Sequence, residues 1–203
     1  KSKIIKVNTR QNNRFLKKIN NKYFLTDTNQ ENLSFVFEIS KRLKVNNNLF
    51  IKTINKFKGL KYRQQIVLNK KFLTIINDSK STSFSSSISL LKANQNIYWL
   101  LGSINKKGDK LELSKKYFKN IKAFIYGKDK KIFSKKLKDK IKYKNFNNLK
   151  DALKEIFVIV KKERPLNSTI LFSPCAASFD NFKNFEDRGL YFNKLVKMYK
   201  NEL

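Results

Sequence analysis

Histidine is absent from the 203-residue sequence, and cysteine occurs once, at Cys175. A single cysteine excludes a disulfide within the chain, and the lack of histidine removes the ligand set of Cys/His zinc sites. It also excludes a Ser-His or Cys-His nucleophile pair. Any chemistry in this chain must therefore use lysine, arginine, acidic and hydroxyl side chains, and backbone N–H groups.

Long apolar runs are also missing. None approaches the roughly 18 residues that a membrane-spanning helix needs, and no charged-then-apolar leader ends in a small-residue cleavage site. We therefore expect a soluble, cytoplasmic protein with no membrane insertion. The sequence is still 40% hydrophobic and contains 18 phenylalanines, so it can bury a core, and its length suits one large domain or a domain and a half.

Acidic residues are few, 15 against 46 basic ones, which gives a formal net charge of +31. Such a charge attracts polyanions, so a lysine-rich module that binds nucleic acid nonspecifically is an alternative interpretation. We give it less weight, because only six of the basic residues are arginine, whose forked guanidinium base-reading proteins favour. Forty lysines amid abundant Asn, Ile and Phe are typical of drift in an AT-rich coding sequence. We therefore expect no nucleic-acid partner.

The first 59 residues show short apolar patterns. Residues 4–7 are strand-like, and apolar residues at three-to-four spacing between 29 and 45 predict an amphipathic helix. A shorter helix is predicted at 50–57, and Gly59 ends it, as a glycine after a helix commonly does. The only composition shift also falls at this glycine, so we expect a domain boundary between residues 59 and 60.

From residue 60 onward, apolar β-branched runs alternate with amphipathic segments. The predicted strands are 66–68 and 72–76, which form a hairpin or a short strand pair, then 96–101, 121–126, 141–146 and 169–172. The predicted helices are 82–91, 111–120, 131–138, 148–161 with Asn147 or Asn148 as its cap, and a last one with Tyr191, Leu195, Met198 and Tyr199 on one face. About five such repeats predict an α/β fold, a Rossmann-like doubly wound, mostly parallel sheet covered on both faces.

Polar loops follow three of the predicted strands, at residues 77–82, 105–109 and 173–188. The carboxyl ends of parallel strands meet at one rim of the sheet, where ligands of open α/β folds bind. These loops offer cations, hydroxyls and helix N-termini, which hold carboxylates and phosphates. We therefore expect an anionic ligand at this rim.

The third loop carries the most specific motif, Ser-Pro-Cys-Ala-Ala-Ser-Phe-Asp-Asn-Phe-Lys-Asn-Phe-Glu-Asp-Arg-Gly at residues 173–189. This run resembles the C-terminal signature of the Mur ligases, in particular of the member that adds D-glutamate to UDP-N-acetylmuramoyl-L-alanine in peptidoglycan synthesis. The resemblance continues through residues 57–63 and 76–82 and is weaker between 128 and 163. It implies an ATP-dependent, amide-forming ligase that works through an acyl phosphate.

The resemblance also implies a D-glutamate site. The residues that would hold the two carboxylates of D-glutamate or approach the acyl phosphate are Lys80, as the catalytic residue, Thr82, Lys107, Ser178 and the backbone of Phe185. The amino acid, ATP and UDP-N-acetylmuramoyl-L-alanine are the implied partners.

ATP contacts follow from the same resemblance. Arg63, Asp78 and Lys80 would reach the ribose and phosphates of ATP when the domain closes, and Asn29 and Asn32 would lie near the adenine. ATP and Mg²⁺ are the implied cofactors, with no metal ligand in this chain. A monomer is expected for the full-length enzyme.

Structural interpretations of several of these residues stay open. Lys80 is one lysine among forty, Thr82 and Ser178 also fit helix caps, and Asp78 fits a cap of the helix that follows it. Lys106 is as good a candidate as Lys107, because the family's loop varies in length here.

Three residues of the motif itself also have structural interpretations. Glu186 and Arg188 fit structural partners within the last helix as well as they fit ligand contacts. Cys175 fits a small loop residue, because nothing in the sequence indicates the lowered pKa that a reactive thiolate needs.

The sequence departs from the family at several positions. It has Lys61-Tyr62 where Pro-His is usual, Thr28 where histidine is usual, and Ser103 where a second glycine is usual. It contains no Gly-x-x-x-x-Gly-Lys-Ser/Thr phosphate loop. A degenerate, nonenzymatic α/β domain retained for assembly is therefore a third interpretation.

The chain begins with Lys1 rather than methionine, so we expect a piece of a longer protein. On this interpretation residues 1–59 end the central ATP-binding domain, and residues 60–203 form the C-terminal amino-acid-binding domain. The family's phosphate loop, magnesium-binding histidine, modified lysine and uracil-binding domain would precede Lys1. We expect this piece to be inactive alone.

Overall fold

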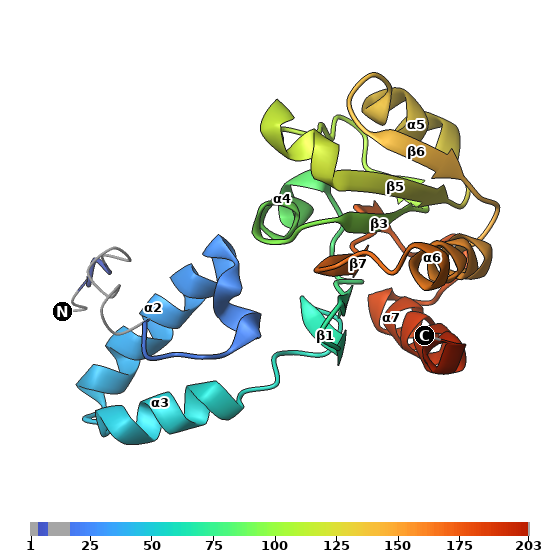
Figure 1. The fold of residues 1–203 in the computed structure, drawn as a ribbon. Helices are drawn as coiled ribbons and strands as arrows, with labels where there is room; N and C mark the ends of the chain where they lie inside the picture. Colours follow the sequence, from blue (N-terminus) through green and yellow to red (C-terminus); the bar gives the residue numbers. More distant parts are fainter. Residues whose placement is uncertain (1–3, 8–16, 203) are drawn as a thin grey trace. The chain divides into compact units, whose positions relative to one another are not determined.

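The computed structural model describes residues 4–7 and 17–202 (Figure 1). The chain divides into two compact units, Lys1–Lys58 and Gly59–Leu203. Within the described residues, no helix combines the length and the apolar character needed to cross a membrane.

The first unit contains the 3-10 helix η1 (Lys22–Leu25) and the helices α2 (Asp27–Arg42) and α3 (Asn47–Lys56). Both helices begin at a polar cap, because the side chain of Thr26 accepts from the N–H of Asn29, and that of Asn46 accepts from the N–H groups of Asn48 and Leu49. Residues 4–7 are described but form no strand, and Ile4 is 90% exposed. The strand predicted there is therefore wrong, since no described strand pairs with it.

The second unit is built on a sheet whose six described strands have the order β1-β2-β7-β3-β5-β6. Their bounds are β1 Gln65–Asn69, β2 Leu73–Asn77, β3 Ile97–Gly102, β5 Ile121–Tyr126, β6 Lys142–Asn145 and β7 Ser168–Phe172. All neighbouring pairs are parallel except β1 and β2, which form the predicted hairpin. Two short strands, β4 (Ile104–Asn105) and β8 (Ala176–Ala177), pair beside it.

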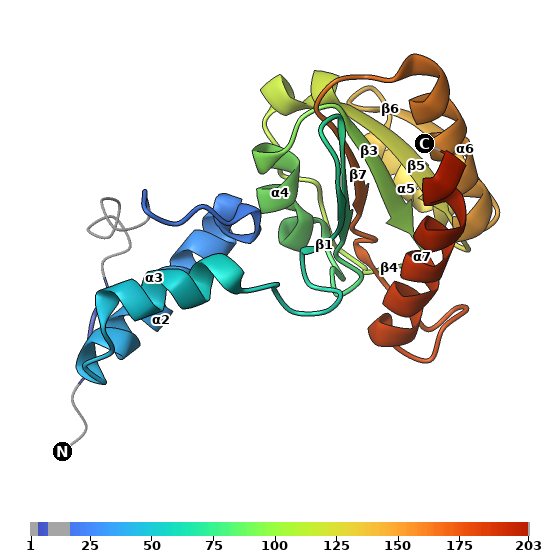
Figure 2. The ribbon, with the colours of Figure 1, turned by 60° about the horizontal axis from the view of Figure 1, so that its bottom comes forward.

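Helices cover both faces of the sheet. Their bounds are α4 Phe84–Ala93, η2 Lys115–Asn120, α5 Lys130–Leu137, α6 Leu149–Glu163, α7 Phe185–Tyr199 and η3 Lys200–Glu202. One apolar core joins α6 and α7 to one face, and a second core joins α4 and α5 to the other. Figure 2 shows α4 on one side of the strands and α6 with α7 on the other. The predicted doubly wound, mostly parallel α/β fold is confirmed.

Local differences from the prediction have physical causes. The helix predicted at 111–120 is wrong in its first half, because Leu111 and Leu113 turn inward while Glu112 and Ser114 are exposed, a period-two pattern of extended chain. Met198 is 61% exposed and lies off the buried face of α7. The predicted cap of α6 is Asn148, whose side chain accepts from the N–H of Asp151 at 2.9 Å.

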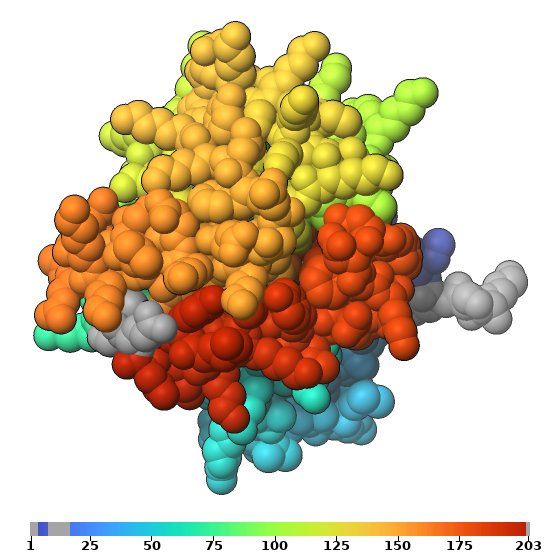
Figure 3. Space-filling view, turned by 90° about the vertical axis from the view of Figure 1, so that its right-hand side faces the viewer, coloured from blue at the N-terminus to red at the C-terminus, as the bar shows by residue number. Residues whose placement is uncertain are grey.

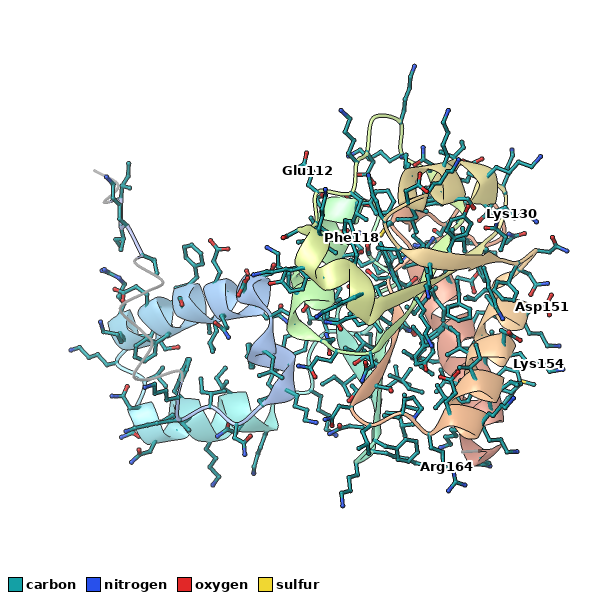
Figure 4. All side chains as sticks on the ribbon, turned by 45° about the horizontal axis from the view of Figure 1, so that its top comes forward. Glu112, Phe118, Lys130, Asp151, Lys154 and Arg164 are labelled. Atoms are coloured by element: carbon teal, nitrogen blue, oxygen red, sulfur yellow. The ribbon has the colours of Figure 1, made fainter. Side chains whose placement is uncertain are left out.

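Lysine side chains extend into solvent from many elements of the second unit. Figure 4 labels two of them, Lys130 on α5 and Lys154 on α6. Edge strand β6 is exposed along its whole length and carries Lys142 and Lys144. Charged side chains on an edge strand discourage pairing with other chains.

Candidate functional site

The three polar loops come together at the carboxyl rim of the sheet. Strands β2, β7 and β3 are parallel neighbours, so the loops that follow them leave the same edge. The pairing of β4 with β8 joins the second loop to the third, through Ile104 opposite Ala177 and Asn105 opposite Ala176. The loop convergence predicted from the sequence is therefore present in the second unit.

Arg188 fastens the first loop to the third. Its guanidinium is fully buried and donates to the carbonyl of Ser79 at 2.7 Å, to the Ser79 hydroxyl at 3.1 Å and to the Ala176 carbonyl at 3.0 Å. It also donates to the Ala177 carbonyl at 3.2 Å. Burial lowers the pKa of Arg188. Arg188 is therefore a structural residue, but its partners are oxygens of the first and third loops rather than the residues of the last helix that the sequence predicts.

Two cations lie over one aromatic ring beside the start of α7. The ammonium of Lys80 is 4.1 Å from the centre of the Phe185 ring, and the Arg63 guanidinium is 6.0 Å from it. Both distances fall within the range of cation–π attraction. The Phe185 carbonyl accepts from the Ser79 hydroxyl at 2.8 Å, which fixes the ring's residue to the first loop. Lys80, Arg63 and Phe185 are thus brought together, although no sequence pattern indicates a role for the ring of Phe185.

Tyr62 holds the backbone of Lys80 in place. Its carbonyl accepts from the N–H of Lys80 at 3.0 Å, and its φ of 61° places it in the left-handed region. The ring of Tyr62 lies against Gly189 so closely that a Cβ on the glycine would overlap it. The resemblance implies a histidine at this position, and here Tyr62 connects α7 to the backbone of Lys80.

Asp78 is turned into the protein. Asp78 is only 6% exposed. One carboxylate oxygen accepts from the N–H of Gln64 at 3.0 Å, and the other accepts from the Ser173 hydroxyl at 2.9 Å. Burial raises the pKa of Asp78 to about 7, against the lowering effect of these two hydrogen bonds and of Arg63. The cap interpretation is wrong, because the carboxyl binds a turn and a strand end. Its contact with ATP stays a prediction.

Hydroxyls continue inward from Asp78 as a buried cluster that sequence reasoning missed. Ser87 lies 2.5 Å from the Ser173 oxygen, 2.8 Å from the Ser81 oxygen and 3.0 Å from the Cys175 sulfur. Burial raises the pKa of Cys175 to about 12, so the thiol stays protonated and fits a small structural residue. The only sign of this cluster in the sequence is the serine-rich run at 81–89.

Thr82 and Ser178 cap no helix. Thr82 is exposed, and α4 begins after Ser83, its N-cap. Ser178 is buried, its carbonyl accepts from the N–H of Phe182 at 3.1 Å, and the cap of α7 is Asn184. The capping interpretation is wrong for both, and their roles toward a ligand stay predictions.

Lys107 lies exposed in the second loop, as does Lys106, so the choice between them stays open. The loop reaches the first one through Asp109, whose carboxylate accepts from the N–H of Phe84 at 2.8 Å. Lys136 of α5 donates to the side-chain oxygen of Asn105 at 2.6 Å and to the Asp109 carbonyl at 2.7 Å. These bonds hold the base of the loop that carries the two lysines.

Asn29 and Asn32 belong to the first unit, and the rim described above is built from the second unit alone. Asn29 is buried and donates from its amide to the Tyr23 carbonyl at 2.7 Å, whereas Asn32 is exposed. Their predicted place near an adenine stays a prediction.

Curated relatives match most of this chain. The protein named "UDP-N-acetylmuramoylalanine--D-glutamate ligase" from Wolbachia sp. subsp. Brugia malayi (strain TRS) is 35% identical over 172 residues, 84% of this chain and 34% of the relative. Its namesake from Rickettsia bellii (strain RML369-C) is 35% identical over 180 residues, 88% of this chain and 40% of the relative. The relative of the same name from Francisella philomiragia subsp. philomiragia is 37% identical over 176 residues, which are 85% of this chain and 42% of the relative.

The remaining comparisons add little. No protein-family model matches the chain. The solved structure of a murein peptide ligase from Psychrobacter arcticus 273-4 matches with a TM-score of 0.43 and 8% sequence identity. The match covers 86% of this chain and 36% of that ligase. The chain spans about a third to two-fifths of the length of the curated relatives it matches. The resemblance predicted from the sequence is confirmed, and this chain is a relative of the UDP-N-acetylmuramoylalanine--D-glutamate ligases.

Proposed function

We propose that this chain supplies the D-glutamate-binding part of an ATP-dependent ligase that adds D-glutamate to UDP-N-acetylmuramoyl-L-alanine in peptidoglycan synthesis. The observation that carries this proposal is the placement of Lys80 and Arg63 over the ring of Phe185, at a rim where three loops meet. The curated relatives supply the reaction class through their names.

The two units have different roles in this proposal. Residues 60–203 form the C-terminal amino-acid-binding domain, and residues 1–59 are the end of the central ATP-binding domain. An apolar stripe along α2 and its C-cap supports the second assignment, because Phe35, Ile39 and the C-cap Leu43 are 46%, 57% and 72% exposed. These side chains lie four residues apart on one helix face, which suits packing against more of a domain.

The reaction implied by the resemblance passes through an acyl phosphate, which the amine of D-glutamate attacks with loss of phosphate. In this chain the protein's contribution is to position the amino acid and to neutralise charge. Lys80 is the proposed catalytic residue, because the ring of Phe185 holds its ammonium in place before the substrate arrives. The proposed ligands of the D-glutamate carboxylates are Thr82, Lys107, Ser178 and the backbone of Phe185.

The rim fits the phosphates of ATP better than it fits a metal ion. Arg63 and Lys80 are suited to phosphate oxygens on domain closure, with Asn29 and Asn32 near the adenine. Asp78 would reach the ribose only after leaving Gln64 and Ser173. Within the described ranges, no group of three or more Asp, Glu or Cys side chains is placed to hold a metal. We therefore assign no step through Mg²⁺ to these residues and place its ligands elsewhere in the full enzyme.

The first test measures binding of D-glutamate to the chain by calorimetry. Lys80→Ala should weaken binding about tenfold or more, since one charge-assisted contact contributes about 1.5–3 kcal/mol. Lys154→Ala removes the same charge from an exposed position on α6 and is the matched control. Equal effects of the two substitutions would contradict the site.

The second test measures turnover. The chain alone should release no ADP, as expected for a piece of a monomeric cytoplasmic enzyme. A chimera that joins the preceding part of the Rickettsia bellii relative to this chain should release ADP when D-glutamate and UDP-N-acetylmuramoyl-L-alanine are both present. If L-lysine or meso-diaminopimelate supports turnover and D-glutamate does not, the substrate assignment is wrong.

The charge of +31 favours a second candidate, nonspecific binding of nucleic acid. That function predicts an affinity that falls steeply with salt and is insensitive to Lys80→Ala. D-glutamate binding that depends on Lys80 has the opposite signature, so the same variant distinguishes the two.

A further inference from the structure

A cavity lies on the side of α7 that faces away from the rim. Its volume is about 490 Å³, and its walls come from the end of β5, the start of α6, the segment 181–182 and α7. Figure 3 shows the side of the molecule where α6 (orange) and α7 (red) reach the surface. A volume of this size is in the range of small-molecule sites.

Helix geometry separates this cavity from the rim that holds Lys80. Residues on an α-helix advance by 100° each, so Phe185 and Gly189 share one face of α7, which contacts Lys80 and Tyr62. The cavity-lining residues Asp187, Tyr191 and Lys194 lie on the opposite face. A ligand in the cavity would therefore occupy a site distinct from the proposed D-glutamate site.

One wall of the cavity favours an anion. It includes the N-terminus of α6, a helix of 15 residues whose first N–H groups carry partial positive charge. Lys194 adds an ammonium to this wall. Asn147 also lines the cavity, and its side-chain oxygen already accepts from Lys130 at 2.6 Å, so its amide group can act toward a ligand only as a donor. Asn148 already serves the helix as its cap.

The other wall offers rings and one carboxylate. Phe182 and Tyr191 both line the cavity, with ring centres 5.5 Å apart and planes at 47°. Such a pair presents an apolar surface on which a planar ring can stack. Asp187 lines the same space, and its carboxylate accepts hydroxyl donors as well as the N–H of Lys183 at 3.4 Å.

The inner wall of the cavity is a buried aromatic side chain. Tyr126, at the end of β5, lines this wall and is 2% exposed. Its hydroxyl interacts with the buried guanidinium of Arg188, and burial raises the pKa of Tyr126. Tyr126 therefore closes the cavity on the inside, and its hydroxyl has a partner within the protein.

We propose that this cavity binds a nucleoside monophosphate. Its phosphate would lie at the N-terminus of α6 beside Lys194, its base would stack on Phe182 and Tyr191, and its sugar hydroxyls would donate to Asp187. Three chemically different parts of the ligand thus match three parts of the cavity.

The test uses AMP as the probe, with adenosine and inorganic phosphate as its two halves, in calorimetric titrations of the whole chain. AMP should bind more tightly than either half. Lys194→Glu should weaken AMP binding about tenfold or more through lost charge-assisted contact, whereas Lys197→Glu, exposed one turn on and outside the cavity, should change it less than about twofold. Phe182→Leu, which removes one of the two stacking rings, should weaken it about threefold or more.

Several results would overturn the proposal. These are no AMP binding at millimolar concentration, equal losses in the two glutamate variants, or loss of AMP binding in Lys80→Ala with none in Lys194→Glu. Circular dichroism shows whether each variant keeps its fold, and Phe182→Leu provides the test if Lys194→Glu unfolds. D-glutamate binding should be unchanged in Lys194→Glu, so failure of this proposal and failure of the proposed function are distinguishable.

Discussion

Replacing Gly189 by alanine tests how the rim is held together. Gly189 lies inside α7, and a Cβ there would approach the Tyr62 Cγ atom to 2.6 Å and its Cβ atom to 3.0 Å. These atoms are close to the Tyr62 backbone, so rotation of the ring does not relieve the overlap. The turn that contains Tyr62 must move, and the N–H of Lys80, which donates to the Tyr62 carbonyl at 3.0 Å, loses its partner.

Two opposing effects set the sign of the change in stability. Alanine is better than glycine in a helix interior by about 1 kcal/mol. Overpacking a close contact costs about 1–3 kcal/mol, and loss of the Lys80 hydrogen bond costs about 1 kcal/mol more. We therefore expect Gly189→Ala to lower the free energy of unfolding by about 1–3 kcal/mol and to weaken D-glutamate binding.

Urea unfolding, followed by circular dichroism, measures the first effect. The double variant Tyr62→Ala/Gly189→Ala is the control, because it removes the ring that the new methyl group meets. On the Tyr62→Ala background, Gly189→Ala should be stabilising, as helix propensity alone predicts. If Gly189→Ala stabilises the protein with Tyr62 in place, the argument that Tyr62 is wedged against α7 is refuted.

Two further predictions concern buried charges. Arg188→Met should lower the free energy of unfolding in urea by about 2–6 kcal/mol, because it leaves the buried carbonyls of Ser79 and Ala176 unpaired, at about 1–3 kcal/mol each. Lys197→Met on the same helix is the control, and equal losses would contradict the reasoning. Because burial raises the pKa of Asp78 from 3.8 to about 7, the folded state keeps a proton that the unfolded chain releases, so stability falls as pH rises from about 4 to about 7, by up to about 4 kcal/mol. Asp78→Asn should flatten this fall in unfolding curves taken across that range, and an unchanged slope would count against the raised pKa.

Periodicity predicted most of the fold because the central strands are buried on both faces. The run 121–126 was predicted as a strand and is β5, and 148–161 was predicted as a helix and is α6, Leu149–Glu163. It failed at 111–120, where two leucines two residues apart are compatible with either period, and at 4–7, where an apolar run alone does not supply a pairing partner.

The sequence predicts which loops form the site, but it does not predict the contacts that their side chains make. Strand ends in a parallel sheet must share a rim, so the convergence of 77–82 with 173–188 follows from topology. The inward turn of Asp78, the position of Lys80 over Phe185 and the contact of Tyr62 with Gly189 depend on packing between residues far apart in sequence. No local pattern encodes such contacts.

The residues of the motif at 173–189 mainly hold the loops of the rim together. Ser173 and Cys175 belong to the buried hydroxyl cluster, Arg188 donates to loop oxygens, and Gly189 makes room for Tyr62. A match to this motif therefore predicts the shape of the rim more directly than it predicts the chemistry there. It follows that Arg188→Met should impair folding and binding together, whereas Lys80→Ala should impair binding in a protein that still folds, and only the second change isolates the chemistry.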